Sequence, residues 1–378
     1  MALPVALSPA CADDEGPPVD QGTSDSGTAT TGSGTTSSAV GTSGSESGSS
    51  SEDGSSSEGG SSSESGDAVD CLPLDDQGRA IPIEDPFERH TVSVGDDPEE
   101  FISYLDEGAG DPVIFIHGAP TSSFLWRNII PYVAEGHRAI AIDVVGYGDS
   151  GTPADATFRY PEHQQWFTNF VDALDLDNIT LVVHDVGSIS GLFYAANNPD
   201  KVRALVHLES VYFPIPSADL PPPQANFIMT EEGQQAILDD NWFIETMMPG
   251  FIERQWCDEE KAVYAGPWAD QARRRVLQIV PLDLPIAGVP ADNQTTFEQF
   301  GNYLATSDVP KLLIHGDPGA LVQDVPVPGP PGSPTMLEIV SGFPNTTVVN
   351  VGPGTHFLQE DHPHEMGEAI RDFLNALP

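Results

Sequence analysis

Six short apolar runs constrain the fold of this chain more than any other feature of its sequence. Each is almost entirely apolar and a polar or ionisable residue follows it: Val113–Ile116, Ala139–Ile142, Leu181–Val183, Ala204–Val206, Lys311–Ile314 and Thr347–Val349. Such runs are typical of strands in a parallel sheet that is buried on both faces. Helix-like segments lie between several of them, and the chain ends in one, with Met366, Ile370, Phe373 and Leu377 at helical spacing. This alternation predicts an α/β fold with a mostly parallel central sheet flanked by helices.

The chain changes character near residue 70. Residues 12–70 are mostly Ser, Gly, Thr, Asp and Glu, with no aromatic residue and no Lys or Arg. Such a segment cannot bury enough apolar surface to offset the chain entropy lost on folding, so we expect a disordered tether. Residues 71–378 are long enough for one large domain with a sizeable core.

The first eleven residues are similar to the end of a lipoprotein signal. They are mostly apolar and finish in Ser8-Pro9-Ala10-Cys11, so Cys11 is the residue expected to carry a lipid anchor. A lipidated Cys followed by a long polar tether predicts an exported protein, anchored or secreted, in the periplasm or at the cell surface. Cys71 and Cys257 could form a disulfide after export, but their spacing does not indicate proximity, and we expect two unrelated thiols.

The composition is strongly acidic, with 58 Asp and Glu against 14 Lys and Arg and a net charge of −44. Residues 1–70 account for −12 of this charge and residues 71–378 for −32, so the acidity extends over the folded part. Repulsion from phosphate groups argues against nucleic acid and anionic membrane surfaces as partners. We interpret the acidic surface as one that is solvated in saline water.

The stretch between Val206 and Lys311 contains no clear strand. It is rich in Trp, Phe, Met and Pro and has helix-like patches. An insertion at this point would lie over the carboxyl ends of the strands, where α/β folds place their binding sites. We therefore expect a helical cap at roughly 211–285.

Asp185 is the candidate nucleophile. It follows Leu181–Val183 in the segment His184–Ser188, at the point where a buried strand is expected to turn into a helix. A nucleophile on such a turn is exposed at the top of the sheet. Ser is the usual residue there, and Asp changes the chemistry, because a carboxylate attacks carbon without first losing a proton.

Two further residues complete a nucleophile, acid and base in that chain order. Glu209 ends the strand that begins at Ala204, so its carboxylate is expected at the same edge of the sheet. His356 follows Thr347–Val349 in a loop from which an imidazole can reach the nucleophile. Asp317, just after Ile314, is an alternative acid, and the residues alone leave this choice open.

His362 and His364 lie beside Asp361 and Glu365, and such combinations occur in metal sites. They precede the last helical segment, and we interpret them as part of an exposed loop. The sequence predicts neither a metal nor a cofactor. The expected partners are a small-molecule substrate and water.

From about Glu99 to the C-terminus the chain resembles the haloalkane dehalogenases, a branch of the α/β-hydrolases. Seven segments carry the resemblance in the order in which the family has them: 104–108, 117–128, 143–150, 184–188, 285–288, 318–321 and 356–361. The most specific is the run Pro-Thr-Ser-Ser-Phe-Leu-Trp-Arg-Asn that ends at Asn128. The resemblance implies the α/β-hydrolase fold and hydrolysis of a small organic substrate.

The resemblance also implies a two-step reaction. Asp185 displaces a leaving group from an sp³ carbon and forms an alkyl-enzyme ester. His356, held by Glu209 rather than by Asp317, then activates the water that hydrolyses the ester. The backbone N–H groups of Ala119 and Val186 would stabilise the oxyanion.

Those last two positions depart from the family's pattern. In the family, an indole N–H directly after the nucleophile and an Asn amide after His-Gly hold the departing halide, but Val186 and Ala119 have no side-chain donor. Each hydrogen bond to a charged group is worth about 1.5–3 kcal/mol, so losing two would slow the displacement by roughly two to four decades. Either the leaving group is no longer a halide or the donors have moved to the cap, which contains Trp242, Trp256 and Trp268.

Three interpretations therefore stay open. The first is a dehalogenase whose halide site has been relocated. The second is an epoxide hydrolase with the same three catalytic residues, in which Tyr212 or Tyr264 of the cap would protonate the alkoxide. The third is an inactive binding or surface protein, which the retained set of Asp185, Glu209 and His356 argues against, because buried charges are costly without a use.

Overall fold

The computed structural model describes residues 73–216, 223–328 and 330–378. The signal-like residues 1–11, the tether expected over 12–70, and Cys11 and Cys71 lie outside the described residues. One unit, Asp67–Pro378, contains all of the elements described below.

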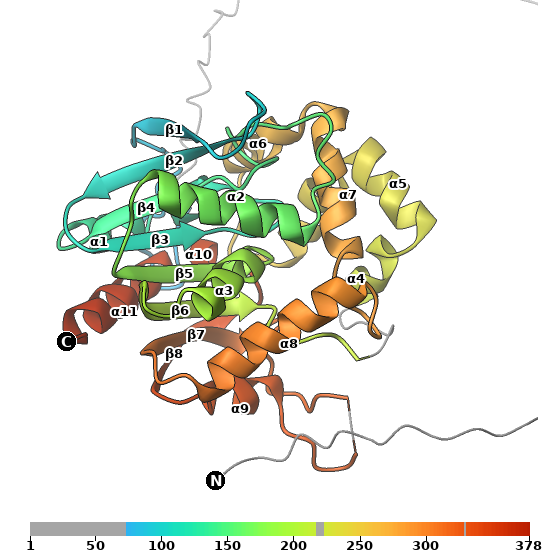
Figure 1. Ribbon diagram of the computed structural model, residues 1–378. Coiled ribbons are helices and arrows are strands. Elements are labelled where there is room, and N and C mark those ends of the chain that lie inside the picture. The colour runs from blue at the N-terminus through green and yellow to red at the C-terminus, as the bar shows by residue number, and fades with distance from the viewer. Residues whose placement is uncertain (1–72, 217–222, 329) are drawn as a thin grey trace, which may run out of the picture. The chain divides into compact units, whose positions relative to one another are not determined.

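Among the described residues, eight strands form one sheet in the order β1-β2-β4-β3-β5-β6-β7-β8 (Figure 1). The strands are β1 Arg89–Ser93, β2 Phe101–Gly108, β3 Pro112–Ile116, β4 Arg138–Ile142, β5 Ile179–Asp185, β6 Val202–Ser210, β7 Lys311–Pro318 and β8 Thr346–Gly354. β1 and β2 are antiparallel to their neighbours at one edge, and all the other neighbouring strands pair in parallel. The six predicted runs lie in β3 to β8, so the predicted parallel sheet is confirmed.

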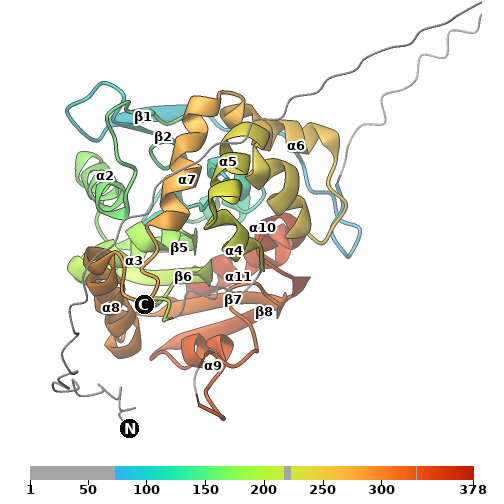
Figure 2. The ribbon, with the colours of Figure 1, turned by 90° about the vertical axis from the view of Figure 1, so that its right-hand side faces the viewer.

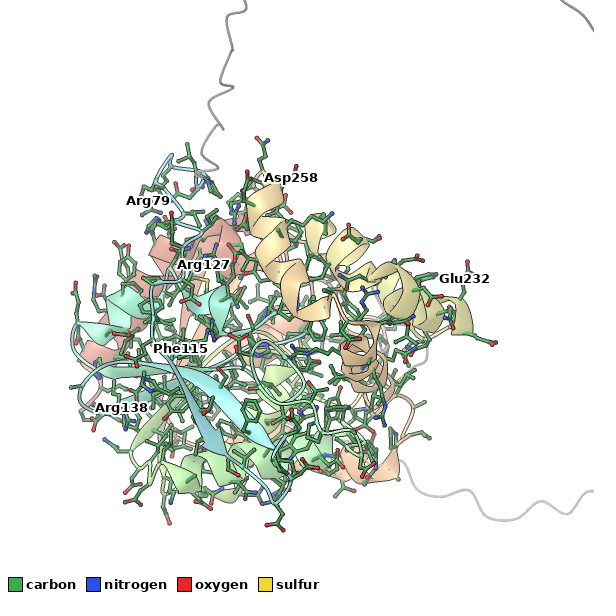
Figure 3. All side chains as sticks on the ribbon, turned by 90° about the horizontal axis from the view of Figure 1, so that it is seen from above. Arg79, Phe115, Arg127, Arg138, Glu232 and Asp258 are labelled. Carbon is green, nitrogen blue, oxygen red and sulfur yellow. The ribbon has the colours of Figure 1, made fainter. Side chains whose placement is uncertain are left out.

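Helices cover both faces of this sheet. The α-helices are α1 Ile130–Ala134, α2 Tyr160–Ala173, α3 Gly187–Asn197, α4 Pro223–Ile228, α5 Glu231–Asp240, α6 Asp258–Ala265, α7 Arg275–Leu282, α8 Ala291–Thr306, α9 Met336–Ser341, α10 Leu358–Asp361 and α11 Pro363–Ala376. α2, α3 and α8 lie on one face, and α1 and α11 lie together on the other (Figures 1 and 2). All five residues of β3 are buried, and Phe115 is enclosed by packed side chains (Figure 3).

The insertion between β6 and β7 forms the cap over the carboxyl ends of the strands. It contains α4 to α7, which lie together beyond the ends of the strands (Figure 2). Its two ends meet where Ile215 pairs with Ile286, close to the expected limits of 211 and 285. Beyond this neck, α8 returns to the body of the protein and packs against α3.

Two further observations concern Cys257 and the length and polarity of the helices. Cys257, at the start of α6, is disulfide-bonded, so the expectation of an unpaired thiol is wrong for this residue. The other two cysteines lie outside the described residues. None of the helices in the described ranges is both long enough and apolar enough to cross a bilayer.

Candidate active site

Asp185 lies on a sharp turn between β5 and α3. It is the last residue of β5, and α3 begins at Gly187. Its φ of +49° is in the left-handed region, which a non-glycine residue rarely occupies and which is associated with functional turns. The turn is tight, because a Cβ at Gly187 would lie 2.0 Å from the carbonyl oxygen of His117. The turn therefore holds the Asp185 carboxylate at the sheet edge, as the sequence predicted.

The structure brings the three predicted residues together in a line. The Nε2 atom of His356 lies 3.5 Å from Oδ2 of Asp185, and its Nδ1 atom lies 3.4 Å from Oε2 of Glu209. Glu209 follows a buried stretch of β6 and is itself fully buried, while His356 is 7 % exposed. One imidazole thus faces a carboxylate on each side.

Backbone donors hold the Glu209 carboxylate. Its Oε2 accepts from the N–H groups of Ala320 at 3.0 Å and Leu321 at 2.6 Å, and its Oε1 accepts from Val322 at 3.3 Å. These three N–H groups fix the orientation of the buried carboxylate. The sequence does not predict these donors, although two of them belong to the segment 318–321 that carries part of the family resemblance.

Asp317, the alternative acid, lies near the end of β7 and is exposed. The imidazole of His356 faces Glu209 instead. The geometry therefore favours Glu209 as the acidic partner of the histidine.

Two backbone N–H groups converge on the Asp185 carboxylate. The N–H of Ala119 donates to Oδ1 at 2.9 Å, and the N–H of Val186 also bonds to the carboxylate. This leaves Oδ2 facing His356. Ala119 and Val186 thus occupy the positions from which donors can stabilise negative charge on Oδ1.

Proximity changes the pKa values of the Asp185 and His356 side chains in opposite directions. Burial lowers the pKa of His356, but its hydrogen bonds to Asp185 and Glu209 outweigh burial and raise it to about 9. Burial raises the pKa of Asp185, but the hydrogen bond and charge of His356 outweigh it and lower the pKa. The two side chains therefore form an ion pair near neutral pH.

We expect Asp185→Asn to lower the pKa of His356 from about 9, because one of its two anionic partners is lost. NMR titration of the imidazole protons, assigned with a His356→Phe variant, measures this. A pKa above the ordinary 6.5 stabilises the fold fully below pH 6.5, and this stabilisation is lost as the pH rises through 9. The Asp185→Asn variant should lack part of this pH dependence of stability, whereas Asp317→Asn should keep it. An unchanged His356 pKa in Asp185→Asn would contradict the interaction.

A cavity of about 140 Å³ opens at Asp185. Its only ionisable lining side chains, within the part of the chain that the structure describes, are Asp185 and His356. The rest of the lining is apolar or aromatic and comes largely from the cap: Ala119, Val186, Ile228, Trp242, Phe243, Met247, Phe251, Val280, Pro281, Leu284, Ala320 and Leu321. An apolar cavity of about 150 Å³ holds a molecule the size of benzene.

The three cap tryptophans differ in their relation to this cavity. Trp242 lines it, and no hydrogen bond engages its indole N–H among the described residues. The indole N–H of buried Trp268 donates to the carbonyl of Pro120 at 2.9 Å. Trp256 packs against Tyr264 and is not part of the lining. Of these three residues, Trp242 is therefore the one that lines the cavity.

Neither of the candidate proton-donating tyrosines lines the cavity. The Tyr212 hydroxyl lies 2.9 Å from Nδ1 of His207, and the Tyr264 hydroxyl donates to Glu360. Both are buried and engaged elsewhere. Neither tyrosine is therefore placed to protonate the alkoxide of an opened epoxide in this cavity.

The expectation of an exposed loop around His362 is wrong. His362 is 2 % exposed, and its Nε2 atom lies 2.6 Å from the carbonyl oxygen of Pro353. The His364 imidazole contacts the Tyr132 hydroxyl and the carbonyl of Ala80. Both imidazoles hold the start of α11 against neighbouring segments.

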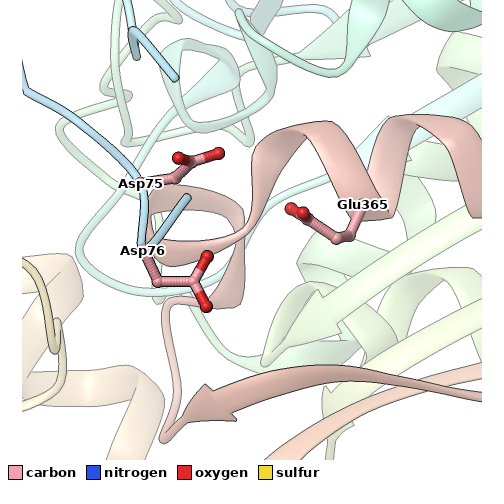
Figure 4. Close-up of side chains that lie close together, drawn as sticks. All are labelled: Asp75, Asp76 and Glu365. Carbon is pink, nitrogen blue, oxygen red and sulfur yellow. The ribbon is translucent and has the colours of Figure 1, made fainter. Parts of the chain in front are cut away.

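Three acidic side chains lie close together near the start of α11: Asp75, Asp76 and Glu365 (Figure 4). Arg79 forms ion pairs with Asp75 and Glu365. Because this guanidinium offsets much of the negative charge, we assign no metal to the cluster.

Comparison with known proteins agrees with this geometry. A family profile described as "alpha/beta hydrolase fold" matches residues 111–363. The haloalkane dehalogenase of Mycolicibacterium smegmatis is 38% identical over 286 residues, which cover 73% of this chain and 88% of that protein. The haloalkane dehalogenase of Sphingobium indicum is 38% identical over 285 residues, which cover 73% of this chain and 92% of that protein.

Solved structures give the same result. The haloalkane dehalogenase DbeA of Bradyrhizobium elkani superimposes with a TM-score of 0.70 at 33% identity, over 77% of this chain and 98% of that chain. DatA of Agrobacterium tumefaciens superimposes with a TM-score of 0.68 at 32% identity, over 78% and 99% of the two chains. The chain is a hydrolytic enzyme of the α/β-hydrolase fold and belongs to the haloalkane dehalogenase family.

Proposed function

We propose that this enzyme hydrolyses small haloalkanes through an alkyl-enzyme ester on Asp185. The observation that carries the proposal is the buried line of Asp185, His356 and Glu209 at the mouth of an apolar cavity. Oδ2 of Asp185 attacks the halogen-bearing carbon, and the halide departs with the bonding electron pair. Oδ1 accepts from the N–H of Ala119 and becomes the carbonyl oxygen of the ester, and the N–H of Val186 also bonds to this carboxylate.

Water hydrolyses the ester in the second step. Esterification removes the negative charge of Asp185, so the pKa of His356 falls and the imidazole becomes available as a base. His356 takes a proton from water as the water oxygen attacks Cγ of Asp185, and Glu209 stabilises the imidazolium. The N–H groups of Ala119 and Val186 hold the oxyanion on Oδ1. The alkoxide then leaves and takes the proton from His356 to form the alcohol, and the proton that remains on the regenerated carboxyl group of Asp185 passes to solvent, which restores the carboxylate.

The cavity limits the substrate class. Its size suits a compact molecule, and its apolar and aromatic lining suits an alkyl chain without charged groups. A short or branched bromoalkane meets both conditions.

The leaving halide is proposed to be held by the indole N–H of Trp242. Ala119 and Val186 have no side-chain donor to offer, and Trp242, whose side chain has an indole N–H, lines the same cavity as Asp185. One hydrogen-bond donor instead of two stabilises the departing halide less. Chloride, the poorer leaving group, should depend on this stabilisation more than bromide.

We expect the wild-type protein to release bromide slowly and chloride barely. Trp242→Phe should lower bromide release by about one to two decades, the worth of one hydrogen bond to an anion. Trp256→Phe is the matched control, because that indole lies outside the cavity lining. Ala119→Asn with Val186→Trp should raise halide release. Full bromide release by Trp242→Phe protein would overturn the assignment of Trp242.

The same assay separates the competing functions. Parallel incubation with epoxides, read as diol formation, tests the epoxide hydrolase, whose two candidate donors are engaged elsewhere. Turnover of neither substrate class would favour an inactive binding protein.

We propose further that the enzyme is exported, with residues 1–11 as the signal remnant, 12–70 as the tether and Cys11 as the lipid anchor. A disulfide-bonded Cys257 supports this, because disulfides persist in oxidising compartments. Residues 71–378 would form the enzyme domain, and the buried Ile81 puts its start before that residue. Membrane association that persists in a Cys11→Ala variant would refute the anchor.

A further inference from the structure

Five buried side chains form one polar cluster between the cap and the body of the enzyme. We call it the cap latch: Arg127, Arg254, Glu260, Tyr264 and Glu360. Arg127 (Figure 3) donates two hydrogen bonds to Glu360, of 2.6 and 3.0 Å, and one to Glu260, of 3.1 Å. Arg254 pairs with both carboxylates, at 2.9 Å from Glu260 Oε2 and 2.6 Å from Glu360 Oε2. The Tyr264 hydroxyl also donates to Glu360.

The latch joins segments that are far apart in the sequence. Arg127 follows the 3-10 turn Ser123–Trp126 of the body, whereas Arg254 precedes α6, and α6 contributes Glu260 and Tyr264. Glu360 lies in the short helix α10, four residues after His356. The carboxylate at the centre of the latch therefore belongs to the segment that also contains the catalytic base.

Three more contacts bind this segment to the same part of the cap. Oδ1 of Asp361 accepts from the N–H groups of Glu253 at 2.9 Å and Arg254 at 3.1 Å. The N–H of Phe357 donates to the carbonyl of Phe251 at 3.3 Å. The Phe251 ring lies edge-on to the His356 imidazole, with centroids 5.8 Å apart. The cap thus contacts the His356 ring and holds Phe357 and Asp361, two of the residues that follow it.

The chemistry of the latch favours one geometry. It contains two guanidinium groups and two carboxyl groups, all with side chains at most 6 % exposed. Burial and the charge of Glu360 raise the pKa of Glu260 to about 7. Buried ion pairs add little net stability, because desolvation offsets the attraction, but removing one member leaves an uncompensated buried charge. The latch therefore favours the docked arrangement of the cap in which each of these groups keeps its partners.

We propose that the cap latch couples docking of the cap to the position of His356, and that Glu360 is a positioning residue for the hydrolytic step. The inference rests on the proposed function, in which His356 acts only after the ester has formed. Loosening the latch should therefore slow hydrolysis of the ester and leave the displacement by Asp185 nearly unchanged. A purely structural role would affect both steps or neither.

The test measures the two steps separately in the full-length protein. A bromoalkane is mixed with the enzyme, samples are quenched over time, and intact mass gives the formation and decay of the alkyl-enzyme. For Tyr264→Phe we expect decay to slow about tenfold, while formation stays within about threefold. Glu360→Gln should show a larger slowing of the same step. If Glu360→Gln does not fold, Tyr264→Phe decides, because it removes one hydroxyl and no charge.

Tyr160→Phe is the matched control. Tyr160 is also buried, and its hydroxyl also joins body to cap, donating from α2 to the carbonyl of Val280 in α7 at 2.6 Å. This variant should keep the wild-type ratio of formation to decay. Equal slowing of both steps in Tyr264→Phe, or a wild-type ratio, would overturn the latch as a positioning device. Absence of an adduct even in His356→Phe protein would instead overturn the proposed function, and the latch with it.

Discussion

Replacing His356 with Phe is expected to stop the reaction at the alkyl-enzyme ester. Displacement needs only the Asp185 carboxylate, whose Oδ2 faces His356 in the wild-type protein and loses that partner in the variant, whereas hydrolysis needs a base to take a proton from water. Loss of a general base typically slows a step by about 10²–10⁴-fold. Incubation with a bromoalkane should therefore release one equivalent of bromide and add the mass of one alkyl group.

Peptide mapping locates the adduct in this experiment. We expect it on the peptide that contains Asp185, and the double variant Asp185→Asn with His356→Phe should carry none. The hydroxyl of Ser188 donates to the backbone carbonyl of Asp185 at 2.5 Å, so it is engaged and not expected to react. An adduct on Ser188 or Ser190 would contradict the assignment of the nucleophile.

The parallel part of the fold could be predicted because burial on both faces leaves a simple mark on a sequence. β3, for example, reads as an uninterrupted apolar run, and all of its residues are buried. The antiparallel edge has no such mark. β1 is half exposed and its residues are mixed in polarity. Its pairing therefore depends on the adjacent strand β2 rather than on its own sequence.

The features of the site also divide into those that the sequence could predict and those that it could not. Asp185, Glu209 and His356 could be predicted because each lies at or just after the end of a recognisable strand, and parallel strands bring their carboxyl ends to one edge. The burial of His362 and the pairing of Arg127 with Glu260 and Glu360 could not be, since they depend on segments that meet only in the folded chain. An isolated charged or imidazole side chain gives no sign of its partner, so exposure was the default expectation.

The proposed latch gives the cap a second role besides covering the substrate. A cap that merely covered the substrate could be held by apolar contacts of many kinds, and loss of one contact would change affinity or stability. Paired buried charges instead join the cap to Glu360, four residues after the proposed base His356. Variation of the cap sequence should then alter the rate of ester hydrolysis as well as substrate preference.

Glu209→Gln is expected to lower steady-state turnover by roughly three decades, and Asp317→Asn is expected to leave it nearly unchanged. The amide cannot stabilise the imidazolium that forms on His356 when water is deprotonated. Its NH₂ group must also replace an oxygen that accepts backbone N–H groups, so a donor would face a donor at Leu321 or at Val322.

Asp317→Asn is a matched control for this comparison, because it makes the same carboxyl-to-amide change near the end of the neighbouring strand. Its side chain is exposed and is not needed to hold the imidazole. Steady-state bromide release, with circular dichroism to verify folding, measures both variants. Greater damage from Asp317→Asn than from Glu209→Gln would assign the acid to Asp317, and it would mean that the 3.4 Å contact between Glu209 and His356 does not support the base during turnover.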